Sequence, residues 1–373
     1  MGSSRHASER KASTEHGTIL RLGGRRGAQM VVGTRLDRVG GGFLLSAAAV
    51  FWLAAWRAPP PPVHRVLVTG GNGYLAQHLL HHLQVTTAHT LGYTVRSASK
   101  QLPRAAGSSF VVTDLAGGEG LTRAVAAFRP TVVVHAAAMS SPKACEKDET
   151  RARAVNAPAV LLDALQQGAP TARVVYISTD QVYAGDLGHA PYPDGASAHP
   201  RNAYGRTKLA FENMLRQQWP AHVVLRSSNM IGPKAPYTGV GKFMQWVGGH
   251  LLGSNETLSL FDNEFRSFVP VGDVVGAVAA AISQPRVGEW PSFNCGGPTR
   301  LSRAELGRLI ALACEVNPGR VLGVSAASVD MGYSSPPDLA MISQGLREQL
   351  RYIPASSVGP TLQTACQELV PPS

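Results

Sequence analysis

Cysteine is scarce in this chain of 373 residues, and the four that occur show no paired spacing. They stand far apart, at Cys145, Cys295, Cys314 and Cys366, so the chain has no Cys-x-x-Cys pair and no zinc-ligand spacing. We therefore predict four reduced thiols in a non-oxidising compartment. Each is expected to be buried and chemically inert. No metal site is predicted.

Charge is also sparse, because Asp, Glu, Lys and Arg together make up 16% of the residues. Residues 1–62 hold nine Lys/Arg against three Asp/Glu, which is +6 of the net charge of +11 and leaves +5 for the remainder. No Arg-rich helix or basic strand with interleaved aromatics accompanies this excess, so nucleic acid is not a predicted partner. The excess suits a ligand that carries phosphate.

The first 62 residues differ in composition from the rest and form a basic leader. Residues 1–38 are rich in Ser, Gly and Arg without periodicity, which predicts disorder. Residues 39–56 carry no charge, yet their 18 positions fall short of the roughly 20 that a membrane span needs. The proline run 59–62 predicts a stiff linker. One interpretation is that residues 39–56 anchor or target the chain, in which case they are its only contact with a membrane. The other is that the leader is poorly ordered and has no role in catalysis. For the remainder we predict a cytoplasmic location.

From residue 63 a buried strand, a glycine-rich turn and a helix follow one another. The apolar run 66–68 predicts the strand, and the sequence 69–76 predicts the turn and the start of the helix. Glycines permit the tight turn and a close approach to a pyrophosphate, while Ala76 keeps the third position small. Amide groups at the helix start then face the phosphates. The predicted cofactor contacts in this turn are Gly70, Gly73, Tyr74 and Leu75.

The second predicted strand, 90–95, lacks the acidic residue that would bind a ribose 2′-hydroxyl. It is followed instead by Arg96 and Ser97, with Lys100 close by. Cations at this point suit a 2′-phosphate, so we predict NADP (as NADPH) and regard NAD as the weaker candidate. The alternative is a solvated arginine at a strand end.

Two further strands, 110–113 and 131–134, extend the pattern. Asp114 and Leu115 follow the first, and Asp114 is a candidate partner for the adenine amino group. Small residues follow the second, and they would let the backbone pass close to the cofactor; they are Ala136, Ala137 and Ala138. His135 is interpreted as a packed histidine and not as a catalyst.

The alternation of strands and helices from residue 63 onward predicts an α/β fold, a Rossmann-type doubly wound parallel sheet over 63–226. A smaller C-terminal α/β substrate lobe, 227–373, is expected to send segments back to it.

The candidate reacting groups lie on a later strand and helix. Thr179 follows the apolar run 173–177, and ligands bind at the carboxyl ends of strands in such sheets. Tyr204 and Lys208 are four residues apart, so they share one face of a helix. A nearby ammonium group favours phenolate. Thr179 can hold a carbonyl, and Lys208 can bond the nicotinamide ribose. Together with the glycine-rich turn, these residues predict hydride transfer.

The segments 178–185 (STDQVYAG) and 204–208 (YGRTK), with Glu212, resemble the extended short-chain dehydrogenase/reductases. Within them the chain is similar to the dTDP-4-dehydrorhamnose reductase group over roughly residues 64–352. The resemblance implies that NADPH reduces the C4 carbonyl of a nucleotide-linked 4-keto-6-deoxy sugar, with Tyr204 donating the proton. It also implies that Asn156 supports a proton-relay water. Substrate contacts are expected at Asp180, Gln181, Asn229 and Arg266.

Several alternatives remain open. A 4,6-dehydratase is disfavoured because Gln181 stands where that chemistry uses a glutamate, and an amide cannot act as a base. An epimerase can use the same Thr179, Tyr204 and Lys208. A non-catalytic regulatory subunit, resembling methionine adenosyltransferase β and bound to a synthetase partner, would keep the same cofactor bed. A homodimer is also open. Arg226 is equally a candidate for a substrate contact and for a structural salt bridge.

Overall fold

The computed structural model describes residues 38–39, 42–43, 63–97, 109–284 and 292–370. Contacts divide the chain into two compact units, Met1–Pro61 and Pro62–Ser373. The first unit contains the paired strands β1 (Arg38–Val39) and β2 (Gly42–Phe43). The rest of the candidate membrane or targeting segment 39–56 lies outside the described residues, as does Lys100. Among the residues that the structure does describe, no helix combines the length and apolar character needed to span a bilayer.

The second unit is built on a seven-stranded sheet in which every neighbouring pair is parallel. Its strands, in sheet order, are β13 (Ser292–Cys295), β8 (His222–Ser227), β7 (Arg173–Thr179), β6 (Val132–His135), β3 (Arg65–Thr69), β4 (Thr90–Val95) and β5 (Ser109–Val112). The chain order β3-β4-β5 runs outward to one edge, and β6-β7-β8 runs to the other. This reversal confirms the predicted doubly wound Rossmann-type fold.

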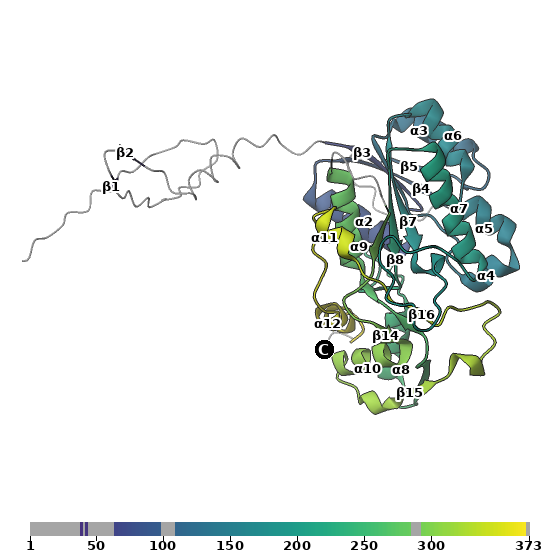
Figure 1. Ribbon diagram of the computed structural model, residues 1–373, viewed down its shortest axis with the longest axis vertical. Coiled ribbons are helices and arrows are strands. Elements are labelled where there is room, and N and C mark those ends of the chain that lie inside the picture. The colour runs from purple at the N-terminus through teal and green to yellow at the C-terminus, as the bar shows by residue number, and fades with distance from the viewer. Residues whose placement is uncertain (1–37, 40–41, 44–62, 98–108, 285–291, 371–373) are drawn as a thin grey trace, which may run out of the picture. The chain divides into compact units, whose positions relative to one another are not determined.

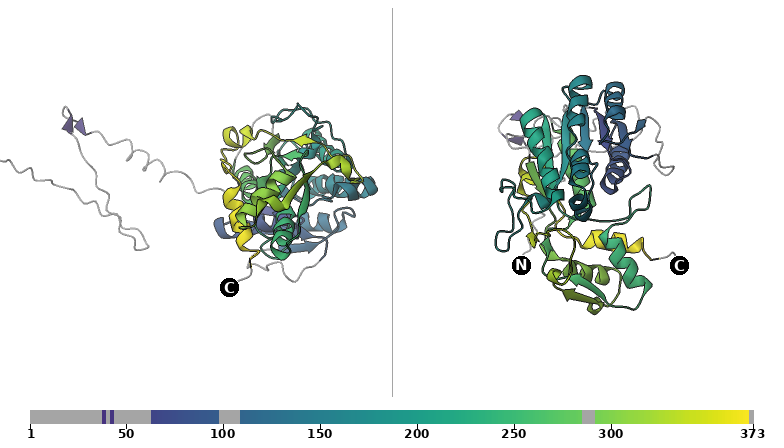
Figure 2. Two further views of the ribbon diagram at one scale, coloured as in Figure 1. Left: turned by 90° about the horizontal axis from the view of Figure 1, so that it is seen from below. Right: turned by 90° about the vertical axis from the view of Figure 1, so that its right-hand side faces the viewer.

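Helices cover both faces of the sheet (Figures 1 and 2). One face carries α3 (Glu119–Phe128), α6 (Ala159–Gly168) and α7 (Ala203–Gln218), with the short helices α4 (Pro142–Lys147) and α5 (Glu149–Asn156) beside α7. The other face carries α2 (Tyr74–Thr86), α9 (Val271–Ser283) and α11 (Gln344–Glu348). Burial on both faces explains why the strands are continuous apolar runs.

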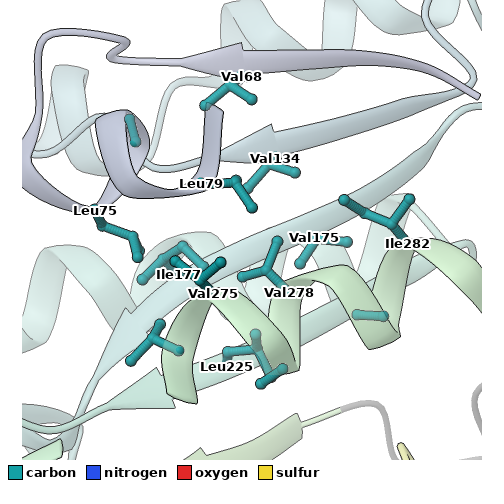
Figure 3. Packing of buried hydrophobic residues seen from close by; sticks show 14 of the residues in the cluster. Val68, Leu75, Leu79, Val134, Val175, Ile177, Leu225, Val275, Val278 and Ile282 are labelled. Carbon is teal, nitrogen blue, oxygen red and sulfur yellow. The ribbon is translucent and has the colours of Figure 1, made fainter. Parts of the chain in front are cut away.

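The core on the α2 and α9 side shows how the helices are held (Figure 3). Leu75 and Leu79 of α2 and Val275, Val278 and Ile282 of α9 belong to one buried cluster with the inward side chains of the sheet. The strand residues of that cluster include Val68, Val134, Val175, Ile177 and Leu225. Because this packing fixes α2, the turn before α2 has a defined position at the carboxyl end of β3.

A smaller lobe follows β8, and parts of the later chain return to the large sheet. The lobe contains three short sheets, namely β10 (Leu258–Phe261) with β15 (Val321–Val324), β9 (Met230–Ile231) with β12 (Val269–Pro270), and β11 (Phe265–Arg266) with β14 (Leu301–Ser302) and β16 (Asp338–Leu339). Its helices are α8 (Phe243–Gly253), α10 (Arg303–Ala313) and α12 (Gly359–Gln367). Three 3-10 turns, η1 (Asp180–Val182), η2 (Pro318–Arg320) and η3 (Ala326–Ser328), complete the second unit. Helix α9 packs against the large sheet and β13 forms one of its edge strands, although both follow residue 227.

The prediction of four reduced cysteines is wrong for one pair. Cys314, at the end of α10, forms a disulfide with Cys366 of α12, and their Cα atoms are 5.3 Å apart. The two residues are 52 positions apart in the chain, so no local spacing indicates the pair. The packing of α10 against α12 brings them within the distance that a disulfide requires. Cys145 and Cys295 are buried free thiols, as predicted.

Candidate active site

A cavity of about 570 Å³ lies at the carboxyl ends of the central strands. Residues after β3, β4, β5, β6, β7 and β8 all line it, because parallel strands end at the same edge of the sheet. The predicted site residues that line it are Gly70, Gly73, Tyr74, Leu75, Arg96, Ser97, Asp114, Leu115, Ala136, Ala137, Ala138, Thr179, Gln181, Tyr204, Lys208 and Asn229. The structure therefore gathers in one place residues that are spread over 160 positions of the chain.

The glycine-rich turn, residues 69–76, has the backbone conformation of a phosphate-binding loop, and we call it the phosphate bed. Gly70 has φ of +74°, and a Cβ there would lie 2.7 Å from the Cα of Ala137. A Cβ on Gly73 would lie 3.0 Å from the Gly70 carbonyl oxygen. Helix α2 begins directly after Gly73, and no side chain among the described residues caps its first amide groups. The open amides and bare backbone fit a dinucleotide diphosphate.

Arg96 and Ser97 lie at the far end of this cavity, after β4. Asn72 of the glycine-rich turn donates a hydrogen bond to the Ser97 carbonyl, at 3.1 Å, which joins the two ends of the bed. Asp114 also lines the cavity, but its carboxylate pairs with Arg151 at 3.3 Å, and both side chains are exposed. Within the described residues Arg96 has no ion pair with a carboxylate, so its charge is available to a ligand.

Helix α7 presents Tyr204 and Lys208 on its cavity face. Its first turn is capped by Asn202, whose side chain accepts a hydrogen bond from the Gly205 amide at 2.9 Å. The Lys208 side chain is 2% exposed, and its Nζ lies 4.3 Å from the centroid of the Tyr176 ring. His135 is fully buried and stacks on the same Tyr176 ring, in agreement with its interpretation as a packed residue.

Burial disfavours the charged forms of both the Tyr204 phenol and the Lys208 amine. Burial raises the pKa of Tyr204, and the charge of Asp180 raises it further, whereas a hydrogen bond with Thr179 lowers it. Burial lowers the pKa of Lys208 to about 7, although Glu212 acts in the opposite direction. The pKa of Tyr204 is therefore raised overall, whereas the sequence predicted that a nearby ammonium would favour phenolate. Desolvation is the larger effect, and it also weakens the charge of the lysine itself.

Asp180 lies directly behind Thr179 and does not line the cavity. Its carboxylate accepts hydrogen bonds from Ser228, at 2.8 Å, and from the Thr179 hydroxyl, at 3.2 Å. Burial raises the pKa of Asp180, while the charge of Arg266 and these hydrogen bonds oppose the rise. Arg266 is itself 3% exposed and donates to the carbonyl of Phe265. The structure thus places two predicted substrate residues in a buried layer under Thr179.

Asn156 is the third predicted residue that the structure does not bring to the cavity lining. Its side chain is fully buried, accepts from the Met139 amide at 2.8 Å and donates to the Thr207 hydroxyl at 3.0 Å. These bonds connect the end of α5 to α7 and to the loop after β6. In this geometry Asn156 holds neighbouring segments in place, and its relay role stays a prediction.

Arg226 makes a structural ion pair, which decides between the two interpretations of this residue. Its guanidinium contacts the Glu212 carboxylate at 2.7 Å, and the two side chains are 6% and 0% exposed. Burial alone would lower the pKa of Arg226, but the Glu212 charge outweighs it and raises the pKa. Arg226 also donates to the Tyr183 hydroxyl, at 3.0 Å. Glu212 accepts from Ser178, next to Thr179, so this pair supports the wall of the site.

Sequence reasoning missed several lining residues, of which Lys242 carries the most chemistry. Lys242 and Phe243 enter the cavity from the smaller lobe, at the start of α8. Ser228 and Met230 line it from the segment after β8. Lys242 follows Lys208 by 34 positions and stands in no recognisable motif, so the cation excess of the chain was its only signal.

The fold and this site define a class: NAD(P)-dependent oxidoreductases of the extended short-chain dehydrogenase/reductase type. A family model described as the RmlD substrate binding domain matches residues 64–367, and the chain belongs to this family. A UDP-glucose 4-epimerase from Azospirillum brasilense is 30% identical over 312 residues, covering 78% of this chain and 87% of that protein. A dTDP-4-dehydrorhamnose reductase from Salmonella typhimurium is 29% identical over 192 residues, 50% of this chain and 61% of that protein.

Solved structures show the same fold. The dTDP-4-dehydrorhamnose reductase from Bacillus anthracis, solved in complex with NADP, superposes with a TM-score of 0.68 at 22% identity. The match covers 82% of this chain and all of that one. At this identity the likeness concerns the fold alone.

Proposed function

We propose that this protein is a reductase that uses NADPH to reduce the C4 carbonyl of a nucleotide-linked 4-keto-6-deoxy sugar. One observation carries the proposal: Thr179, Tyr204 and Lys208 line the same cavity as the glycine-rich turn. This combination provides an orienting hydroxyl, a proton donor and a lysine amine beside a dinucleotide-binding turn. Relatives named as dTDP-4-dehydrorhamnose reductases support the choice of substrate class.

Tyr204 is the proposed acid of the reduction. Because burial raises its pKa, the phenol is protonated at neutral pH and can give its proton to the oxygen of a reduced carbonyl. When bound, the reduced nicotinamide supplies the hydride. Thr179 holds the carbonyl oxygen beside the phenol through its hydroxyl. Lys208, one helical turn from Tyr204, stabilises the resulting phenolate and hydrogen-bonds the ligand on the cofactor side of the cavity.

The cofactor preference rests on the end of β4. No carboxylate follows this strand, whereas Arg96 and Ser97 line the cavity there. Of the carboxylates near the adenosine end, Asp114 is engaged with Arg151. A cation without a carboxylate partner suits a 2′-phosphate, so we propose NADPH as the preferred cofactor and NADH as the weaker one.

An epimerase is a second candidate, because a UDP-glucose 4-epimerase matches over 87% of its own length. The same Thr179, Tyr204 and Lys208 can serve it. The two reactions differ in their net use of cofactor, since a reductase oxidises one NADPH per turnover and an epimerase consumes none. The regulatory alternative, with a synthetase partner, stays a prediction, as does the homodimer.

The test is NADPH oxidation, followed by absorbance, with the purified protein and dTDP-4-keto-6-deoxyhexose generated in place. A parallel reaction contains UDP-glucose and NAD⁺, the oxidant that takes up the C4 hydride during epimerisation, and it is analysed for UDP-galactose. In a third reaction NADH replaces NADPH. Oxidation of NADPH with the keto sugar, faster than oxidation of NADH, supports the proposed reductase. Epimerised product without net oxidation supports the second candidate. Tight NADPH binding without either product contradicts both.

A further inference from the structure

The smaller lobe contributes a cation to the cavity. Of the residues that line it, Arg96, Lys208 and Lys242 are basic. Arg96 lies at the proposed 2′-phosphate end, and Lys208 lies beside Tyr204. Lys242 stands immediately before α8, and its side chain is exposed toward the open cavity. Neither proposed catalysis nor the proposed cofactor preference uses it.

The loop that carries Lys242 is bonded directly to the phosphate bed. Gln77 of α2 is fully buried and lies at the centre of these bonds. Its Nε2 donates to the carbonyl of Asn72, at 2.8 Å, and to the Thr238 hydroxyl, at 2.9 Å. Its Oε1 accepts from the backbone amides of Tyr237, at 3.2 Å, and Thr238, at 3.0 Å. One side chain thus joins the glycine-rich turn to the smaller lobe.

A second set of bonds positions Lys242 over the start of α2. The Tyr74 hydroxyl donates to the carbonyl of Pro233, at 2.9 Å. The Lys242 amide donates to Gln245 Oε1, at 2.7 Å, and Gln245 Nε2 donates to the carbonyl of Gly232, at 2.6 Å. The Lys242 ammonium then lies 5.6 Å from the centroid of the Tyr74 ring. Tyr74 is the first residue of α2, where the phosphate bed opens.

In the part of the chain that the structure describes, no carboxylate neutralises Lys242. Among the described residues it takes part in no ion pair, and the acid that lines the cavity, Asp114, is paired with Arg151. A lysine held beside uncapped helix amides is suited to bind phosphate as a point charge.

We infer that Lys242 is a diphosphate-binding residue, by which the smaller lobe closes onto the ligand held by the glycine-rich turn. This inference rests on the proposed function. Two diphosphates enter such a site, one in the dinucleotide and one in the nucleotide sugar. The position of Lys242 beside Tyr74 favours the dinucleotide. The lobe that binds the sugar would then also contact the cofactor, so that sugar binding would depend on whether the cofactor is present.

The test measures ligand affinities of the full chain with Lys242→Met. Lys234→Met is the matched control, because Lys234 belongs to the same loop, contacts Glu368 and does not line the cavity. NADPH binding is followed by its fluorescence in the absence of sugar. Loss of a charged hydrogen bond predicts a Kd about tenfold higher or more in Lys242→Met, with little change in Lys234→Met. The Kd for adenosine 2′,5′-bisphosphate, which has no diphosphate, is expected to stay within about twofold.

The remaining outcomes separate the two diphosphates and the two proposals. A rise in KM for the nucleotide sugar with unchanged NADPH affinity assigns Lys242 to the sugar diphosphate. Unchanged values for both ligands, in a variant with wild-type thermal unfolding, overturn the inference while the proposed function stands. Lys242→Arg, which keeps the charge, is expected to retain most of the affinity. Wild-type protein that binds no NADPH overturns the proposed function and this inference together.

Discussion

Burial acts in opposite directions on the two titratable residues of the catalytic helix face. It raises the pKa of Tyr204 and lowers that of Lys208, because in each case the neutral form is easier to desolvate. At physiological pH the phenol is therefore protonated, and a substantial fraction of the Lys208 amine is neutral. Such a site has a proton ready on the phenol and can accept negative charge from a ligand.

Removal of the Tyr204 hydroxyl tests the proposed acid. Tyr204→Phe is expected to bind NADPH with little change and to lose turnover by roughly 10²–10⁴-fold, the usual contribution of a general acid. Steady-state oxidation of NADPH gives the turnover, and fluorescence titration gives the affinity. Unchanged turnover would contradict the role assigned to Tyr204.

Lys208 predicts a pH dependence of stability in the cofactor-free protein. Its pKa is about 7 when folded and near 10.4 in an unfolded chain, so between these values only the unfolded chain binds the proton. The free energy of unfolding should therefore rise with pH above about 7, by up to about 1.4 kcal/mol per pH unit from this group.

The measurement is urea unfolding at pH 7 and pH 9, for the wild type and for Lys208→Met. The difference between the two proteins removes the contribution of all other groups that titrate in this range. We expect the wild type to gain about 1–3 kcal/mol relative to the variant between these two values. If the free energy of unfolding changed equally with pH in the wild type and in Lys208→Met, Lys208 would not be desolvated in the folded protein.

At the scale of elements, the contact between α7 and the η1 turn sets the distance between Tyr204 and Thr179. Gly205 makes this contact, because a Cβ at this position would overlap the carbonyl oxygen of Gln181 and lie 2.8 Å from the Cβ of Pro200. The glycine in the YGRTK segment is thus required by packing and not by its backbone angles. The buried Arg226–Glu212 pair ties α7 to β8 on the same side.

Gly205→Ala is therefore expected to displace α7 from the η1 turn. The cost of overpacking is about 1–3 kcal/mol of stability, and turnover should fall more than NADPH affinity does, because Tyr204 and Thr179 move apart. Gly249→Ala is the matched control, since Gly249 also lies in a helix but has open space around its position. It should leave turnover unchanged and raise stability by up to about 1 kcal/mol. Unfolding curves and NADPH oxidation measure both effects, and equal behaviour of the two variants would contradict this role of Gly205.

At the scale of the whole molecule, the smaller lobe is held together partly by a covalent bond. The Cys314–Cys366 disulfide joins α10 and α12, which pack in the apolar cluster of that lobe. The buried Gln77 joins the lobe to the phosphate bed through hydrogen bonds. Reduction should thus loosen the lobe without removing the dinucleotide bed.

The disulfide predicts a count of thiols. Alkylation of the denatured but unreduced chain should modify two cysteines, Cys145 and Cys295, and alkylation after reduction should modify all four; intact mass distinguishes the two states. Reduction should also lower the free energy of unfolding by about 2–4 kcal/mol. The Cys314→Ala/Cys366→Ala double variant is the control, since a reductant should not affect it further. Four modified cysteines without reduction would contradict the bond.

Much of the fold was predictable because its signals are local. The strands, the glycine-rich turn and the start of α2 follow from short apolar runs and from glycines, and the structure differs only at a few strand ends, such as that of β7, which extends to Thr179. The gathering of Thr179, Tyr204 and Lys208 at the cavity follows from the rule that parallel strands present their carboxyl ends together.

The amino-acid sequence by itself thus determined the α/β class, the dinucleotide bed and the candidate reacting groups, since each depends on residues close together in the chain. Only the tertiary structure decided the disulfide, the ion pair of Arg226, the position of Lys242 and the layer that holds Asp180 and Arg266 under Thr179. It also showed that burial raises the pKa of Tyr204, where the sequence predicted that a nearby ammonium would favour phenolate. These features depend on which distant segments pack together and on how much water the packing excludes. Neither can be predicted from the spacing of residues along the chain.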